Sequence, residues 1–410
     1  MAEDGGRRAL ASRLAVGMLV VAATLAVQRL AADLGTLVPA ILAEEPPTAL
    51  WNRDGTNYWF APRLALEAMW STLHDADAYA AALSAEASRP LEMRNWSYPP
   101  TMLLVLLPFG AVPFQLSIVL FPAVTLVGFV AAAWAAKRSL APRLPTGALV
   151  LALLPALAIN LSGGQNGWLT GALLLGALAT WRDRPFLSGL LLGLLVVKPH
   201  LAVLLGLLAL VAMQPQRIVG AALSSLGLIA VSTFVFGVQA WEGYLTEIVP
   251  YQARVPFEWS GWFLYGMLGG LPWGLREGLT AEGAWAVQGL VAFVALALLV
   301  PVLRRVDRPL IAAVAVLAAS LCLVPYAFDY DACALLVLCG LAAATPGNGA
   351  PLRLASALIP ASITLLATVQ YATSMPLAPI LLLGVLSAAA AGALDLSAYT
   401  RAARLPASSM

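Results

Sequence analysis

The sequence predicts an all-α, polytopic integral membrane protein with about 12 transmembrane helices plus short re-entrant or interfacial helices. Hydrophobic residues make up 61% of the 410 residues, and charged residues only 11%. Apolar stretches of about 20 residues, the length of helix that crosses a bilayer, recur along nearly the whole chain. Because lipid offers the backbone no hydrogen-bonding partner, such stretches cross the membrane as helices. We treat residues 1–410 as a single multi-pass domain.

The apolar stretches set the expected spans in chain order. They cover residues 14–34, 114–136, 146–161, 167–181, 186–197, 200–213, 217–237, 284–303, 309–325, 330–346, 353–371 and 376–394. Segments 99–112 and 262–273 are apolar but short, and we expect re-entrant or tilted pieces there. At about 1.5 Å per residue, 186–197 is too short for a core about 30 Å thick. We therefore favour a hairpin of two short helices over one span at 185–213.

Lysine and arginine in the short loops predict the orientation, because cytoplasmic loops carry an excess of both. The first apolar stretch continues for about twenty residues without a clear cleavage site, so we interpret it as a retained helix and not a signal peptide. With the N-terminus in the cytoplasm, the cytoplasmic side collects Arg7, Arg8, Arg13, Lys137, Arg138, Arg143, Arg182, Arg184, Arg217, Arg304, Arg305, Arg308, Arg353, Arg401 and Arg404. The chain is then a bacterial-type inner-membrane protein with both termini in the cytoplasm and an extracytoplasmic loop at about 39–98.

Five polar clusters interrupt the apolar sequence. They are "WNRDGTNYW" (51–59), "RNWSYPP" (94–100), "SGGQNGW" (162–168), "VVKPHL" (196–201) and "VPYAFDYD" (324–331). All five fall on the extracytoplasmic side or in the outer leaflet of the predicted topology. Since charged groups at membrane depth are costly and usually retained for a task, we expect the clusters to meet at one site. The cytoplasmic loops contain no Gly-rich phosphate loop, which disfavours a soluble nucleotide donor.

Asp54 is the candidate catalytic residue. It lies in the first extracytoplasmic loop, where a carboxylate can act as a general base on a sugar hydroxyl. The alternative is a solvated loop aspartate, with Trp51 and Trp59 serving as interfacial anchors.

Lys198 is the strongest single candidate for a functional charge, because it interrupts a long apolar stretch beside a proline. A helix break at membrane depth is tolerated where it lines a water-filled cavity, and a lysine there suits a lipid phosphate. His200 follows as a candidate substrate contact. The alternative is that Lys198 snorkels to the interface.

The remaining clusters supply candidate substrate contacts, each with a plainer alternative. Gln165 and Asn166 can hydrogen-bond a sugar or phosphate, although the glycines around them also suit a simple hairpin turn. Tyr98, followed by two prolines, shapes a cavity roof or merely opens a helix.

The turn near residue 330 adds Tyr326, Asp329 and Asp331. The carboxylates of Asp329 and Asp331 can hold a sugar, assist a proton transfer or pair with Lys198 or an arginine. Three cysteines, Cys322, Cys333 and Cys339, lack zinc-ligand spacing, and we expect neither a metal nor a cofactor.

The order of the clusters resembles the polyprenol-phosphate-mannose-dependent glycosyltransferases of family 87. The resemblance is carried by a loop aspartate followed by a tyrosine, "YPP" before an apolar run ending in "PFGAVP", a Gly-Gln hairpin leading to Lys-Pro, and a "PYxxDYD"-like turn. It runs from about residue 50 to 340, and 163–204 is its most specific part.

This resemblance implies a GT-C fold and an inverting transfer of a sugar, mannose by family habit, from a polyprenyl-phosphate donor to a lipid or glycan acceptor. It places the base at Asp54, although Arg53 and Gly55 depart from the paired acids of many GT-C enzymes. Lys198, with Arg53 or Arg94, would hold the donor phosphate, and Tyr58 would contact substrate. Some enzymes of this kind place a histidine near the donor, but none maps onto the 326–331 turn here, so either Asp329 or Asp331 takes its place or the role is absent.

Two other classes remain open at this stage. Broken helices and buried charges also suit a transporter or lipid flippase, although the sequence shows no repeated halves. A non-catalytic subunit of a surface-polysaccharide assembly system is the third alternative. For a glycosyltransferase, the expected partners are the donor, the acceptor and membrane lipids. We expect no nucleic acid partner.

Overall fold

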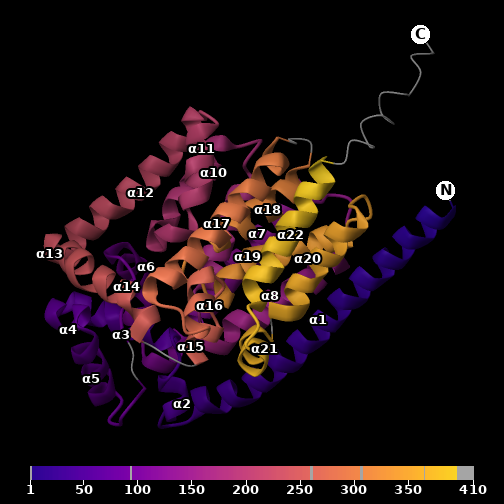
Figure 1. Ribbon diagram of the computed structural model, residues 1–410. Coiled ribbons are helices and arrows are strands. Elements are labelled where there is room, and N and C mark those ends of the chain that lie inside the picture. Colours follow the sequence, from indigo (N-terminus) through magenta and orange to yellow (C-terminus); the bar gives the residue numbers. More distant parts are fainter. Residues whose placement is uncertain (1, 93–94, 259–261, 305–307, 364, 395–410) are drawn as a thin grey trace.

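The computed structural model describes residues 2–92, 95–258, 262–304, 308–363 and 365–394, which form a bundle of helices (Figure 1). Six helices in these ranges are long and apolar enough to cross a membrane: α1 (Ala2–Leu42), α7 (Phe114–Leu140), α8 (Thr146–Gly163), α12 (Pro215–Phe236), α17 (Ala281–Leu303) and α22 (Leu377–Leu394). Between them lie shorter apolar helices: α6 (Pro100–Gly110), α9 (Gly167–Ala179), α10 (Pro185–Gly193), α11 (Val203–Val211), α18 (Pro309–Leu323), α19 (Cys333–Ala344) and α20 (Ala350–Ile363). The predicted all-α polytopic fold is confirmed.

One expected boundary is corrected. The span predicted at 353–371 is divided, since α20 ends at Ile363 and α21 (Leu366–Thr373) follows. Pro360, which cannot donate a helical hydrogen bond, lies in the last turn of α20 and weakens the helix there. The segment expected as a loop at 39–98 contains four short helices: α2 (Thr48–Trp51), α3 (Gly55–Leu66), α4 (Trp70–His74) and α5 (Ala76–Glu86).

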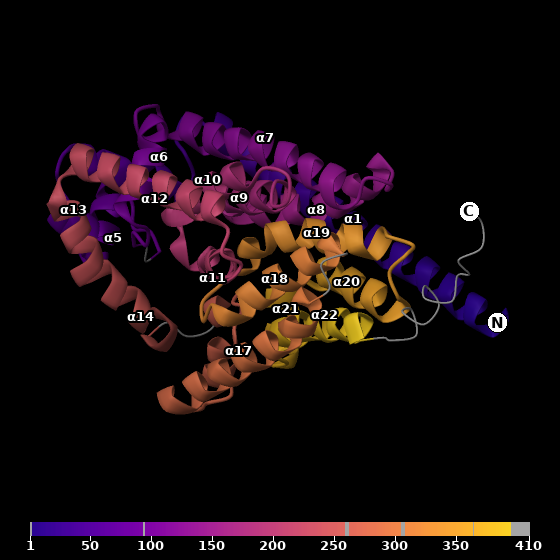
Figure 2. The same ribbon diagram turned by 90° about the horizontal axis from the view of Figure 1, so that it is seen from above.

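The centre of the bundle is built on α18 and α19. All side chains of α19 from Cys333 to Ala343 are buried, as a helix that is apolar on every face requires. Figure 2 shows this pair between α8 on one side and α17 on the other. Gly340 permits the close approach of α19 to α8, because a Cβ there would lie 2.5 Å from the Cβ of Ala152.

An aromatic cluster fixes α3 against α6 and α7. Trp51 stacks on Phe114 with ring centroids 4.0 Å apart, and the Trp59 indole donates to the carbonyl of Val112 at 3.0 Å. Gly110 packs against the ring of Pro62. These contacts hold the residues just before α3, Asp54 among them, at a defined place beside the bundle.

The chain between α9 and α12 forms the favoured hairpin. Gly189 and Gly193 pack α10 closely on Arg217 and Ala221 of α12, a small-residue contact of the kind that joins membrane helices. Because 189 meets 217 and 193 meets 221, α10 and α12 run in the same direction. The chain must therefore return through α11, which excludes a single span at 185–213.

Arg217 marks the shared end of α10 and α12. Its guanidinium stacks on Trp181 at 3.5 Å from the ring centroid and donates to Ser188 at 3.3 Å and to the Trp181 carbonyl. It was expected at the cytoplasmic start of the span at 217–237, and it is fully buried at 0% exposure. It ties the α9–α10 connection to the start of α12.

Short helices gather at one end of the bundle. Figure 1 shows α2, α4 and α5 at the lower left, far from the start of α1 and the end of α22 at the upper right. Near the short-helix end also lie α13 (Val238–Gly243), a π-helical turn η3 (Tyr244–Ile248), α14 (Val249–Glu258), α15 (Trp262–Tyr265) and α16 (Gly270–Arg276). Among the basic residues used for the orientation, Arg305, Arg401 and Arg404 lie outside the described residues.

Candidate active site

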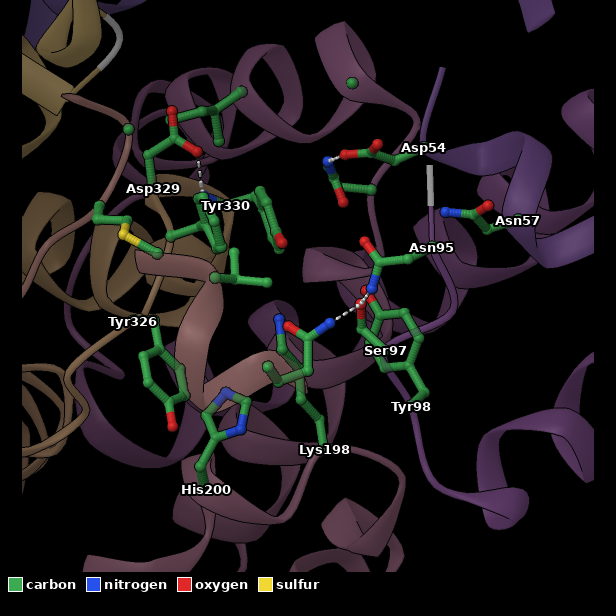
Figure 3. A pocket seen from close by; sticks show the side chains of 18 of the residues that line it. Asp54, Asn57, Asn95, Ser97, Tyr98, Lys198, His200, Tyr326, Asp329 and Tyr330 are labelled. Carbon is green, nitrogen blue, oxygen red and sulfur yellow. Dashed lines mark hydrogen bonds between the residues drawn. The ribbon is translucent and has the colours of Figure 1, made fainter. Parts of the chain in front are cut away.

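A cavity of about 660 Å³ lies where the 39–98 segment, the hairpin break and the turn near residue 330 meet. Figure 3 shows Asp54 on one wall and Asp329 on the opposite one, with Lys198 and His200 below them. Eight of the predicted site residues line this cavity: Asp54, Tyr58, Tyr98, Gln165, Lys198, His200, Tyr326 and Asp329. Side chains from all five polar clusters are thus brought together.

Asp54 is held by the turn between α8 and α9. The Gln165 side-chain amide donates to the Asp54 carboxylate, and Arg53 donates to the carbonyl of Leu161. Gly164 adopts the left-handed conformation, with φ 67°, and a Cβ on Gly55 would lie 3.1 Å from its carbonyl oxygen. The two glycines therefore let the backbone of the Asp54 loop dock directly on the α8–α9 turn.

Gln165→Ala is expected to lower turnover by roughly tenfold, the worth of one hydrogen bond to a charged group. Turnover and donor affinity, measured on one preparation, show whether the loss falls on turnover. Gln214→Ala, just before α12, is the matched control. An unchanged turnover in Gln165→Ala would remove Gln165 from the support of Asp54.

Lys198 lies at the hairpin break in a non-helical conformation, with φ −150° and ψ 71°, between the 3-10 turns η1 (Leu194–Val197) and η2 (Pro199–Leu201). The Thr101 hydroxyl, at the start of α6, donates to the Val196 carbonyl at 3.2 Å. A side chain of α6 thus provides a hydrogen bond to a backbone carbonyl next to the break, as broken helices at membrane depth require.

The Lys198 ammonium forms a buried ion pair with Asp331 and lies 4.7 Å from the centroid of the Tyr330 ring. The second oxygen of Asp331 accepts the backbone N–H of Phe328 at 3.0 Å. The Lys198 side chain is 8% exposed and that of Asp331 0%. Asp331, predicted to bind substrate, does not line the cavity, because it lies behind Lys198 as its counter-ion.

The turn near residue 330 begins with a short antiparallel bridge. Leu268 donates to the Ala327 carbonyl at 2.8 Å, and the Asp329 N–H donates to that of Gly266 at 3.0 Å. Asp329 follows in η4 (Asp329–Ala332), outside the helical spans, and accepts the Tyr330 N–H at 2.7 Å. Burial raises the pKa of Asp329 to about 7, although the Tyr330 N–H and the charge of Arg29 lower it. Near neutral pH this carboxyl group is therefore divided between its charged and neutral forms.

Other predicted residues do not line the cavity. Arg53 is directed to Leu161 on the α8–α9 turn, and Asn166 is buried beneath that turn at 1% exposure. Arg94 lies outside the described residues.

The sequence interpretation missed several polar side chains of the wall. These are Arg29, Asn57, Asn95, Ser97, Ser162, Tyr244, Gln252 and Tyr330. Most lie within or beside the polar clusters, where proximity was a usable signal. Three do not: Arg29 lies inside the first apolar span, and Tyr244 and Gln252 lie in η3 and α14, which were not predicted.

Apolar helices around a cavity lined by polar and apolar side chains, with carboxyl groups on two walls, define a polytopic membrane protein with a candidate substrate site. The model of glycosyltransferase family 87 matches residues 96–325, more than half of the chain. The chain therefore belongs to glycosyltransferase family 87, and this membership indicates glycosyltransferase activity. No curated protein and no solved structure matches the chain. The matched residues include Gln165 and Lys198, whereas Asp54 precedes them and Asp329 follows.

Proposed function

We propose that the protein transfers a sugar, mannose by the habit of the resembled enzymes, from a polyprenyl-phosphate donor to a lipid-linked or glycan acceptor, with inversion at the anomeric carbon. The observation that carries this proposal is that the wall of the cavity carries both polar and apolar side chains. A lipid-linked sugar likewise has a polar head and a hydrocarbon chain.

The polar side chains of the wall include Asp54 and Lys198 together with Asn57, Asn95 and Ser97. Gln252 donates to the Ser97 hydroxyl at 2.9 Å (Figure 3). Amides, hydroxyls and tyrosine rings are the groups that bind sugars by hydrogen bonding and stacking.

Apolar side chains of the wall lie in η3, in α14, at the end of α20 and just before α21. They are Ile248, Val249, Val255, Pro256, Ile363 and Leu365. Burying hydrocarbon against such side chains contributes about 0.8 kcal/mol per CH₂ group. A nucleotide-linked sugar has no hydrocarbon to place there, so this wall favours a lipid-linked donor.

The proposed reaction needs one base and one anion-binding site. Asp54 removes the proton of the acceptor hydroxyl, whose oxygen forms a bond to the anomeric carbon of the sugar. The bond from that carbon to the phosphate oxygen breaks, and its electron pair leaves with the polyprenyl phosphate. Lys198 contributes positive charge beside this leaving group. A phosphate leaves readily, so a strong general acid is not required.

The proposed reaction takes place on the extracytoplasmic face of a bacterial-type inner membrane. The cavity lies among the short helices, away from the end where Arg182 and Arg217 lie beside the α9–α10 connection. The positive-inside rule assigns that basic end to the cytoplasm. Both termini would then be cytoplasmic.

The expected outcome of a donor assay tests this function. Protein in lipid nanodiscs is expected to transfer radiolabelled mannose from polyprenyl-phosphate mannose to a member of a lipid acceptor panel, with no transfer from a nucleotide-linked mannose. The Asp54→Asn variant serves as the negative control in the same nanodiscs. Transfer from the nucleotide-linked donor alone would overturn the proposal.

A further inference from the structure

The donor phosphate needs more positive charge than Lys198 supplies. Lys198 and Asp331 form a buried pair in which the two charges balance. A buried pair of this kind is costly to separate, because either charge left alone in a low-dielectric interior is strongly disfavoured. A phosphate that approaches Lys198 therefore meets a cation whose charge is already neutralised by Asp331.

Arg29 of α1 presents a second cation to the same cavity. It lines the wall with Ser162, whose hydroxyl accepts from its guanidinium at 2.7 Å. Its side chain is 40% exposed, against 8% for Lys198. Its guanidinium lies a long 4.0 Å from the carboxylate of Asp33, and its charge also acts on Asp329. Because its side chain is more exposed than that of Lys198, an incoming anion can contact Arg29 without first separating a tight buried pair.

We infer that Arg29 is the principal ligand of the phosphate group of the lipid-linked donor, with Lys198 as a second, weaker contact. This inference rests on the proposed function. A guanidinium is planar and offers paired N–H donors that match two phosphate oxygens at once. As the sugar departs, negative charge grows on those oxygens, and Arg29 stabilises the growing charge.

Farnesyl phosphate and farnesol are suitable probes, because they share one hydrocarbon chain and differ in the phosphate. Wild-type protein is expected to bind farnesyl phosphate at least about tenfold more tightly than farnesol, as a charge-assisted contact provides. Arg29→Met is expected to remove most of this preference and leave the affinity for farnesol unchanged. Inorganic phosphate, which lacks the chain, is expected to compete only at about a hundredfold higher concentration, since chain burial adds the remaining affinity.

Arg13→Met is the matched control, because Arg13 is exposed on the same helix at its other end. Its preference for farnesyl phosphate is expected to equal that of wild type. Arg29→Lys keeps the charge but loses the planar fork, and is expected to weaken farnesyl phosphate binding by about threefold. This variant decides the question if Arg29→Met does not fold.

Two outcomes separate this inference from the proposed function. A full preference for farnesyl phosphate in both Arg29 variants would overturn the role of Arg29, while the lipid-phosphate donor would stand. A wild-type protein that binds farnesol and farnesyl phosphate equally would overturn both, because no phosphate site would then exist in the cavity. Competition by inorganic phosphate as strong as that by farnesyl phosphate would assign the site to a free anion and not to a lipid.

Discussion

Asp54→Asn is expected to lower turnover by about a hundredfold or more, the usual scale for the loss of a general base. Asparagine keeps the size of the side chain and its ability to bond to Gln165, but it cannot accept the proton of the acceptor hydroxyl. Donor binding is expected to change little, because the base contacts the acceptor. Single-turnover transfer and donor binding, measured on one preparation, separate these two effects.

Asp77→Asn is the matched control for this substitution, since Asp77 is an exposed residue of α5 in the same segment. Its turnover is expected to equal that of wild type. Near-normal turnover in Asp54→Asn would move the base to Asp329, on the opposite wall. The pKa of Asp329, raised to about 7 by burial, suits a general base at neutral pH. Asp331 is no longer a candidate for the base, because its carboxylate forms a buried ion pair with Lys198.

Hydropathy was sufficient to predict the all-α, polytopic membrane fold. Period and length identify apolar helices, and the short stretch at 186–197 already favoured a hairpin over one long span. The packing of Gly189 on Arg217 decided between them. The divided helix at 353–371 was not predicted, because Pro360 inside an apolar run does not by itself show where a helix ends.

The sequence did not show which charged side chains pair with one another. Lys198 and Asp331 are separated by 133 residues, and nothing in either motif shows which acid faces which base. Gln165 was predicted to contact substrate, and its bond to Asp54 depends on how the α8–α9 turn docks on the segment before α3. Residues in separate helices meet only through tertiary packing, which a single sequence does not specify.

Arg29 was missed for a different reason. It lies four residues before Asp33 on α1, a spacing at which opposite charges on a helix commonly pair, and this local explanation conceals a role elsewhere. Only the position of α1 beside the end of α8 shows that this face of the helix borders a cavity. A charge within an apolar span was nevertheless a usable signal, because it needs a polar environment there.

Lys198→Met is expected to destabilise the protein by about 3–5 kcal/mol, because it leaves the Asp331 carboxylate buried without its partner. Sequence alone leads to a different expectation, namely that removing a membrane-embedded charge leaves thermal stability unchanged. The ion pair is the reason for the change: the Asp331 side chain is 0% exposed and cannot be solvated once the ammonium is gone. Thermal denaturation in one detergent measures the effect.

The double variant Lys198→Met with Asp331→Asn separates the structural role of the pair from its role in the site. Removing both charges together is expected to restore stability to within about 1 kcal/mol of wild type, because no buried charge is left unpaired. The phosphate then loses its second cation, so affinity for farnesyl phosphate is expected to fall by a few-fold, less than in Arg29→Met. A double variant as unstable as Lys198→Met would show that the pair does not explain the loss. A double variant with wild-type affinity would confine Lys198 to a structural role at the hairpin break.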